Sequence, residues 1–196
     1  MYEKYIKRLL DIFTSLLLLP ILFVAFLIIG LLIKLEDHGP VFYTAERIGK
    51  SGRVFRMYKF RSMNVNAPML LNEDGSTFNS HDDPRLTKIG RIIRETSIDE
   101  LPQLINVLKG EMSIVGPRPS LASALGTYKE DEIDKLKVRP GITGYTQAYF
   151  RNNLSNREKR LKDAWYANNV SFLLDMRIIA RTIVTVLHKE GLYTNK

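Results

Sequence analysis

The chain is organised around one central segment, 94-RETSIDELPQLINVLKGEMSIVGPRPS-120, which joins two adjacent carboxylates to an apolar helix and a Pro-Arg-Pro turn. The helix is predicted from four apolar residues that share one face by their spacing, namely Leu101, Leu104, Ile105 and Leu108. Pro102 marks the first turn, because proline lacks an N–H and clashes with the preceding turn at interior positions. Gly110 supplies a C-terminal stop. We interpret Asp99 and Glu100, at the N-terminal end of this helix, as the chemical centre.

Two interpretations of this carboxylate pair are open. Free N–H groups and the helix macrodipole favour an ionised carboxylate at a helix N-terminus, so we expect Asp99 to be charged at neutral pH. An ionised aspartate suits a nucleophile or a metal ligand. The ordinary alternative is a capping box formed by Ser97 and Glu100, with no chemical role. The residues around the pair distinguish a chemical role from a capping box.

A long apolar segment near the N-terminus indicates a membrane helix. From Ile12 to Ile33, 22 consecutive residues carry no charge. At ~1.5 Å per residue, a helix of that length about covers the ~30 Å hydrocarbon layer. Pro20, in the middle of the segment, predicts a break that frees the carbonyl of Leu16, for which Thr14 and Ser15 are candidate partners.

Basic residues flank this apolar segment on both sides. They are Lys4, Lys7 and Arg8 before it, and Lys34, Arg47, Lys50, Arg53, Arg56, Lys59 and Arg61 after it. A spanning helix normally has its positive bias on one side only. The flanks therefore favour a re-entrant helix, broken at Pro20, over a spanning one, and they divide the chain into residues 1–36 and 37–196.

Composition limits the partners and the metals. The 196 residues carry a formal net charge of +8, with most of the excess after the apolar segment, which favours anionic lipid head groups or a phosphate-bearing substrate, with nucleic acid as the other candidate. There is no cysteine, so disulfides and thiolate zinc sites are excluded, and His38, His81 and His188 are scattered. Any metal should be a hard cation held by oxygen.

The other segments predict a mostly α fold with one small β-hairpin. Residues 41–48 and 53–60 read as strands joined by 49-GKSG-52, and the basic and aromatic residues of the second strand could hold a phosphate or simply form a solvated face. Residues 64–84 read as a long loop. A basic amphipathic helix follows from Pro84, with the pattern of an interfacial helix, and it brings Arg94 near Asp99.

Beyond the central segment, residues 112–115 predict a short strand, residues 129–137 a charged helix and residues 139–144 a turn. Residues 170–187 predict an amphipathic helix that packs on the domain or lies on the membrane. The two prolines around Arg118 restrict its backbone, as expected if it holds a phosphate or a base edge. Cations around a carboxylate nucleophile fit phosphoryl chemistry, in which a divalent cation would complete the charge neutralisation.

With these motifs in this order, the chain resembles the bacterial monotopic phosphoglycosyl transferases, of the small stand-alone kind typified by bacillosamine-phosphate transferase. The resemblance covers nearly the whole chain. Its motifs are the anchor with Pro20, 58-YKFRSM-63, 83-DPRLT-87, 97-SIDELPQ-103, 106-NVLKGEMS-113, 115-VGPRP-119 and 139-RPGITG-144. Such a resemblance implies a membrane-anchored enzyme whose residues 37–196 form a catalytic domain on the cytoplasmic face of the bacterial inner membrane.

The resemblance also implies a reaction with two steps. The aspartate matching Asp99 attacks the β-phosphate of a UDP-sugar and releases UMP, and polyprenyl phosphate, expected to be undecaprenyl phosphate, then takes the sugar phosphate from the aspartate. Glu100 is the supporting carboxylate. Mg²⁺ is required and is expected at Asp99. The positions implied to lie near the phosphates or the nucleotide are Lys59, Arg61, Arg94, Pro117, Arg118, Pro119 and Arg151.

Two departures from the family pattern bear on details. Leu19-Pro20 replaces the usual Ser-Pro at the helix break, and 145-YTQAYFRNN-153 differs from the Gly-Trp-Ala-Gln form. The donor, expected to be an N-acetylated sugar, therefore need not be bacillosamine. A hexose-phosphate transferase of the same fold and a membrane-tethered basic module that binds anionic lipid or nucleic acid are the alternatives. We expect membrane lipids and not nucleic acid as partners. The sequence also allows a homodimer.

Overall fold

The computed structural model describes residues 1–72, 78, 80, 82–151 and 153–188. Its α-helices are α1 (Lys7–Asp37), α2 (Lys88–Glu95), α3 (Gln103–Lys109), α4 (Tyr145–Tyr149), α5 (Asn156–Asn168) and α6 (Phe172–Leu187). Its strands are β1 (Phe42–Ile48), β2 (Val54–Phe60), β3 (Ser113–Val115) and β4 (Gly141–Thr143). The predicted class, mostly α with a small hairpin, is confirmed.

The hairpin forms where its sequence predicts it. Strands β1 and β2 pair antiparallel from Phe42 opposite Phe60 to Ile48 opposite Val54. The short 3-10 turn Lys50–Gly52 connects them, and Gly52 adopts a φ of 78°, which favours glycine. One side of the hairpin packs under α3, as Phe55 and Met57 share a buried cluster with Val107 and Met112.

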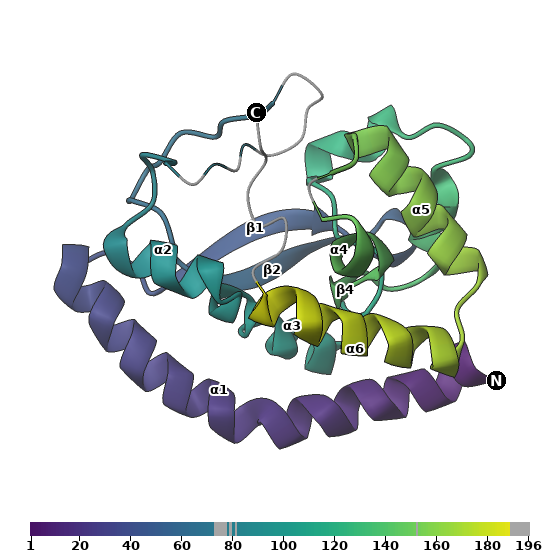
Figure 1. Cartoon of the computed structure of the whole chain (residues 1–196), viewed down its shortest axis with the longest axis horizontal. Coiled ribbons are helices and arrows are strands. Elements are labelled where there is room, and N and C mark those ends of the chain that lie inside the picture. Colours follow the sequence, from purple (N-terminus) through teal and green to yellow (C-terminus); the bar gives the residue numbers. More distant parts are fainter. Residues whose placement is uncertain (73–77, 79, 81, 152, 189–196) are drawn as a thin grey trace.

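Helix α1 is one bent helix and is not broken at Pro20. It runs without interruption from Lys7 to Asp37 and bows around the rest of the molecule (Figure 1). Proline removes one backbone hydrogen bond and crowds the preceding turn, which bends a helix while the bonds on either side continue it. The Ser15 hydroxyl, one candidate for the freed carbonyl, finds no hydrogen-bond partner among the described residues. The predicted break is therefore corrected to a bend.

One face of α1 lies against the rest of the protein along its length. The buried residues of the helix are Lys7, Asp11, Ser15, Leu22, Ile29, Gly30 and Ile33. Opposite them, large apolar side chains such as Phe13, Phe23, Leu27 and Leu31 are exposed. Within the described residues, α1 together with the short turn before it is long and apolar enough to cross a membrane, by length and composition alone.

Both ends of α1 are fastened to the same body. At the start, Lys7 Nζ lies 2.5 Å from Asp175 Oδ2, and Asp11 accepts hydrogen bonds from the Ser113 hydroxyl and the next backbone amide. At the end, Asp37 forms a two-pronged ion pair with Arg61. The helix ends one residue past the predicted boundary after residue 36, and the division into two functional parts stays a prediction.

Two segments differ from their predicted structure. Residues 129–137 form only a 3-10 turn over Ile133–Lys137 and not a longer helix. The predicted turn at 139–144 contains β4, which pairs in parallel with β3. A Cβ at Gly141 would lie 2.1 Å from the Gly116 amide nitrogen, so the close approach of these two strands requires glycine.

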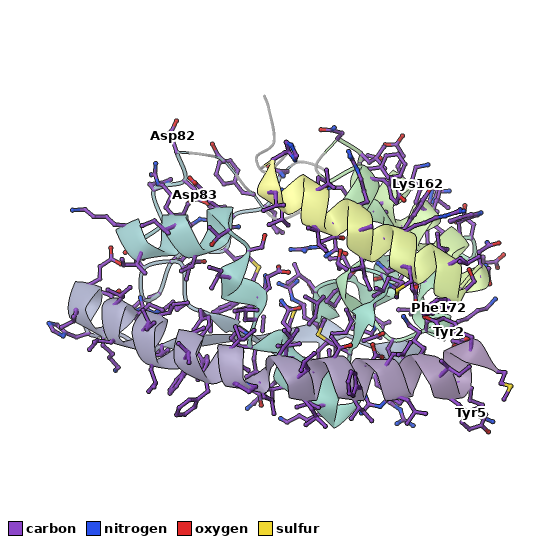
Figure 2. All side chains as sticks on the ribbon, turned by 60° about the horizontal axis from the view of Figure 1, so that its bottom comes forward. Tyr2, Tyr5, Asp82, Asp83, Lys162 and Phe172 are labelled. Carbon is purple, nitrogen blue, oxygen red and sulfur yellow. The ribbon has the colours of Figure 1, made fainter. Side chains whose placement is uncertain are left out.

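Helix α6 confirms the predicted C-terminal helix, but most of its apolar side chains face outward. Its buried residues are Asp175, Ile178 and Thr185. Its exposed apolar residues include Phe172, Leu173, Met176, Ile183 and Leu187. Figure 2 shows Tyr2 beside Phe172, and their rings meet edge to face with centroids 5.9 Å apart. The inner face of α6 is held by Ile178, which lies in a buried apolar cluster, and by polar contacts of Asp175 and Thr185, while its outer apolar surface is uncovered.

Candidate active site

Asp99 and Glu100 lie in a 3-10 turn, Ile98–Glu100, between α2 and α3. Ser97 reverses the chain there with a φ of 59°, a left-handed conformation that is uncommon for a residue other than glycine. No side-chain capping bond forms at this turn or at the start of α3, so the alternative interpretation of Ser97 and Glu100 as a capping box is wrong. Asp99 is only 6% exposed and lies ahead of α3, not within it.

Lys59 connects the hairpin to both carboxylates. Its Nζ lies 2.5 Å from Glu100 Oε1 and 3.7 Å from Asp99 Oδ2. Arg118 reaches Glu100 from the Pro-Arg-Pro turn, with 3.7 Å between Nη1 and Oε1. Three segments that are far apart in the sequence therefore meet at one pair of acids, and the binding of phosphate by Lys59 and Arg118 stays a prediction.

The charges around the pair act differently on its two members. Burial raises the pKa of Asp99, and Lys59, Arg94 and Arg118 only partly oppose this rise. Burial also raises the pKa of Glu100, but the positive charges of Lys59 and Arg118 outweigh it and hold that pKa at about 2. Because α3 begins only at Gln103, the cations rather than a helix end would keep Asp99 ionised.

A rigid support holds the Pro-Arg-Pro turn. The Pro117 carbonyl accepts a hydrogen bond from the Gly141 amide, and the Arg118 carbonyl accepts one from Lys135 Nζ at 3.2 Å. Lys135 is itself buried and lies 3.1 Å from the buried carboxylate of Asp163. The Arg118 side chain, in contrast, is 56% exposed. The backbone of the turn is thus fixed while the guanidinium projects from it.

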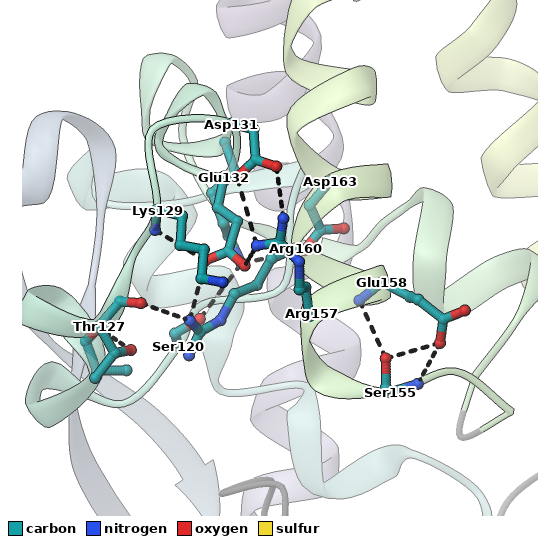
Figure 3. A network of polar contacts seen from close by, with 12 residues as sticks. Ser120, Thr127, Lys129, Asp131, Glu132, Ser155, Arg157, Glu158, Arg160 and Asp163 are labelled. Atoms are coloured by element: carbon teal, nitrogen blue, oxygen red, sulfur yellow. Dashed lines mark hydrogen bonds and ion pairs between the residues drawn. The ribbon is translucent and has the colours of Figure 1, made fainter.

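A second layer of ion pairs surrounds this support (Figure 3). Glu132, which is buried, accepts from Arg157 at 2.8 Å and from Arg160 at 3.2 Å. Arg157 also pairs with Asp131. These contacts join the start of the 3-10 turn Ile133–Lys137 to α5. Arg157 and Arg160 are therefore paired with acids other than Asp99 and Glu100.

Four predicted positions lie apart from the carboxylates or are not joined to them by described contacts. Arg61 is buried and occupied by Asp37 and by the carbonyls of Pro40 and Met63, so it serves the end of α1. Arg151 follows α4, where its amide donates to the Thr146 carbonyl, and its place in the site rests on the resemblance. Pro119 belongs to the same turn as Arg118, and Pro20 lies on the exposed side of α1.

Sequence reasoning missed one cation of the site. Arg47, on β1, lies near enough to Arg118 and Glu100 for both charges to affect its pKa. In the sequence it stands out only as one of many basic residues after the apolar segment. The register of the hairpin was the available signal, because it places Arg47 and Lys59 on the same face.

Known proteins are similar to this chain over nearly its whole length. A family model described as bacterial sugar transferase matches residues 2–189. An uncharacterized sugar transferase, EpsL of Bacillus subtilis, is 43% identical over 95% of this chain and 90% of its own length. The undecaprenyl-phosphate galactose phosphotransferase of Salmonella typhimurium is 39% identical over 97% of this chain but only 42% of its own length.

The name of a third relative gives a different sugar. The UDP-N-acetylgalactosamine-undecaprenyl-phosphate N-acetylgalactosaminephosphotransferase of Aeromonas hydrophila is 39% identical over 95% of this chain and 45% of its own length. The chain thus spans less than half the length of the Salmonella and Aeromonas proteins. Fold, site and matches together define an enzyme of the sugar transferase class. The chain belongs to the bacterial sugar transferase family, and its resemblance to the phosphoglycosyl transferases is confirmed.

Proposed function

We propose that this enzyme moves a sugar 1-phosphate from a UDP-sugar to polyprenyl phosphate at the cytoplasmic face of the bacterial inner membrane, as an early membrane step of glycoconjugate assembly. The observation that carries the proposal is the buried Asp99 beside Glu100, with Lys59, Arg94 and Arg118 around them. The cations outnumber the carboxylates, which suits ligands that bring negative charge. The names of the Salmonella and Aeromonas relatives give undecaprenyl phosphate as the acceptor.

In the first step, a carboxylate oxygen of Asp99 attacks the β-phosphorus of the donor. A new bond forms between that oxygen and phosphorus, and the bond from phosphorus to the bridging oxygen breaks. UMP leaves with the bridging oxygen and its electron pair, so no proton has to be transferred. Lys59 and Arg118 lie where they can neutralise phosphate oxygens and lower the repulsion between anion and anion.

In the second step, a phosphate oxygen of the acceptor attacks the same phosphorus. The bond from Asp99 to phosphorus breaks, and the carboxylate is restored with its electron pair. Glu100 stays ionised throughout because its pKa is about 2. Its role is to hold Lys59 in place between the two acids and the phosphates.

Mg²⁺ is part of the proposal, with Asp99 as the protein ligand. Among the described residues no group of three or more histidine, cysteine, aspartate or glutamate side chains could hold a metal ion by itself. The two adjacent carboxylates still fit Mg²⁺, which proteins often bind through one or two carboxylates together with substrate phosphates and water. Asp99 is the more available of the two for binding a metal, since Glu100 forms the close ion pair with Lys59. When bound, the ion would neutralise phosphate charge.

A panel of UDP-sugars tests the reaction and the donor. An N-acetylated sugar is the favoured donor, and a hexose is the second candidate, because the names of relatives include both galactose and N-acetylgalactosamine. The purified chain should release UMP, and not UDP, from one of these donors when polyprenyl phosphate is supplied. Release of UDP would indicate transfer of the sugar without its phosphate and would exclude the proposed reaction.

We further propose that α1 enters one leaflet and returns, so that the catalytic domain stays on one side. The contacts of Lys7 with Asp175 and of Asp37 with Arg61 support this placement, since both ends of the helix bind the same body. Cysteines introduced at Glu3 and at Glu130 should therefore react with an impermeant thiol reagent from the same side of sealed vesicles. Labelling from opposite sides would instead establish a spanning helix. The homodimer stays a prediction.

Replacing Lys59 should shift the pH dependence of the first step. Because Lys59 lowers the pKa of Asp99, Lys59→Gln should raise that pKa further, so that a higher pH is needed to ionise the nucleophile. We expect the acid limb of UMP release to move up by about one to two pH units. Single-turnover UMP release measured from pH 5 to 9 checks this shift. Lys50→Gln, in the exposed hairpin turn, is the control and should leave the limb unchanged; an unmoved limb in Lys59→Gln would contradict the assigned role.

A further inference from the structure

Arg47 lies at the end of β1 that faces the Pro-Arg-Pro turn. Its backbone bridges to Leu121, and the next amide, of Ile48, donates to the Ser120 carbonyl at 3.0 Å. Strand β1 is thereby joined to the residues that directly follow Arg118 and Pro119. The Arg47 side chain consequently starts from a fixed strand beside a fixed turn.

The hairpin register places this arginine on the face that bears Lys59. Arg47 is opposite Phe55, and Lys59 is opposite Tyr43, and directly opposed residues in an antiparallel pair point to the same side. Along the strands, the two cations are separated by four residues, or about 13 Å. Two long side chains at that spacing can reach toward one site from its two ends, and Glu100 contacts Lys59 while its charge also acts on Arg47.

Arg47 has no counter-ion of its own in the described part of the chain. Its Nε is buried without a hydrogen-bond partner, and no described carboxylate forms an ion pair with it. Burial lowers its pKa, the charge of Arg118 lowers it further, and Glu100 acts in the opposite direction. Glu100 is already engaged by Lys59 at 2.5 Å. Glu100 is the acid that both Arg47 and Arg118 sense, and Lys59 already engages it, so these two neighbouring guanidiniums favour a bound anion between them.

We propose that Arg47 is a substrate-binding residue that holds a phosphate group together with Arg118. This inference rests on the proposed function, because it takes the phosphate from one of that reaction's two substrates. The planar guanidinium offers two parallel N–H donors, which match two oxygens of one phosphate. A nucleoside diphosphate donor and a lipid phosphate acceptor both present this chemistry, and kinetics can separate them.

The experiment compares Arg47→Gln, Arg47→Lys and Arg56→Gln in the 196-residue chain in detergent micelles. Arg56 is the matched control, because it is an exposed arginine of the same hairpin that faces the other side, opposite Glu46. Initial rates are measured against UDP-sugar by UMP release and against polyprenyl phosphate by product formation. Arg47→Gln should raise one of the two KM values about tenfold to hundredfold with a smaller change in kcat, as expected for a lost charged hydrogen bond.

The substrate whose KM rises is the one that Arg47 binds. Arg47→Lys should be intermediate, because it keeps the charge but loses the two-pronged geometry, and Arg56→Gln should match the wild type. Wild-type values of both KM in Arg47→Gln would overturn the inference, while UMP release by the wild type would leave the proposed function intact.

A second readout separates binding from folding. If Arg47 serves a ligand, then removing its unpaired charge should leave the Tm of the ligand-free protein unchanged or higher. Saturating UDP for the donor arm, or polyprenyl phosphate for the acceptor arm, should then raise the Tm of Arg47→Gln by less than it raises that of the wild type. A lower ligand-free Tm with a full ligand-induced rise would show a structural role and overturn the inference. This comparison also holds if the wild type releases no UMP and the proposed function fails.

Discussion

Asp99→Asn should abolish UMP release from the donor, by at least about 10³-fold, since an amide cannot replace the nucleophilic carboxylate. The change keeps the size of the side chain in its buried place, so the neighbouring ion pair of Lys59 with Glu100 should survive. Covalent labelling of the chain by a donor with ³²P in its β-phosphate should disappear together with UMP release. Quenched-flow UMP measurements and gel autoradiography of the same samples check both effects.

Asp131→Asn is the control for this experiment. Asp131 is also an aspartate paired with a basic residue, but it is exposed and lies with Arg157 in the outer network. Its variant should retain label and UMP release at wild-type levels. Label remaining on Asp99→Asn after denaturation would assign the nucleophile to another residue and would remove the first step as written.

Asp175→Ala should destabilise the protein more than any substitution outside the site. Asp175 is 1% exposed and accepts from Lys7 Nζ at 2.5 Å and from the hydroxyls of Tyr2 and Tyr166, each at 2.6 Å. Its removal leaves a buried ammonium without a partner, which typically costs about 3–5 kcal/mol of the free energy of unfolding. We also expect the N-terminal half of α1 to lose its fixed position against α6.

Denaturant unfolding in one detergent, followed by circular dichroism, measures this loss. Arg177→Ala, two residues along the same helix and exposed, is the control and should change the free energy of unfolding by less than about 0.5 kcal/mol. Equal unfolding midpoints for Asp175→Ala and the wild type would mean that the contact between Lys7 and Asp175 does not hold α1 to the domain.

Local patterns predicted the elements whose signals lie within a few residues. The hairpin, the stop of α3 at Gly110 and the helix within residues 170–187 all follow from spacing, turn residues and caps. The carboxylate pair and three of its cations also follow from the sequence, because the motifs that contain them occur together. In each case the deciding interactions are short-range, or the combination of several motifs in one order indicates them.

The predictions from sequence were wrong where a residue far away in the chain determines the local structure. Strand β3 finds β4 about 28 residues away, and segments of three residues are too short to show alternation. Arg61 was assigned to phosphate binding, but Asp37, which lies 24 residues earlier, occupies it. Helix α1 continues through Pro20 while one face packs on the domain along both halves, a contact that the apolar pattern does not encode.

The position of Arg61 has a mechanical consequence for the enzyme. Lys59 lies in β2 and Arg61 directly follows this strand, so about 7 Å of backbone separates the contact with the catalytic acids from the contact with the end of α1. With α1 in the lipid as proposed, this short stretch of backbone fixes the distance between the catalytic acids and the membrane helix, and so the height of the reaction above the bilayer. The acceptor then needs only to diffuse in two dimensions with its phosphate at that height, and the nucleophile does not have to swing toward it.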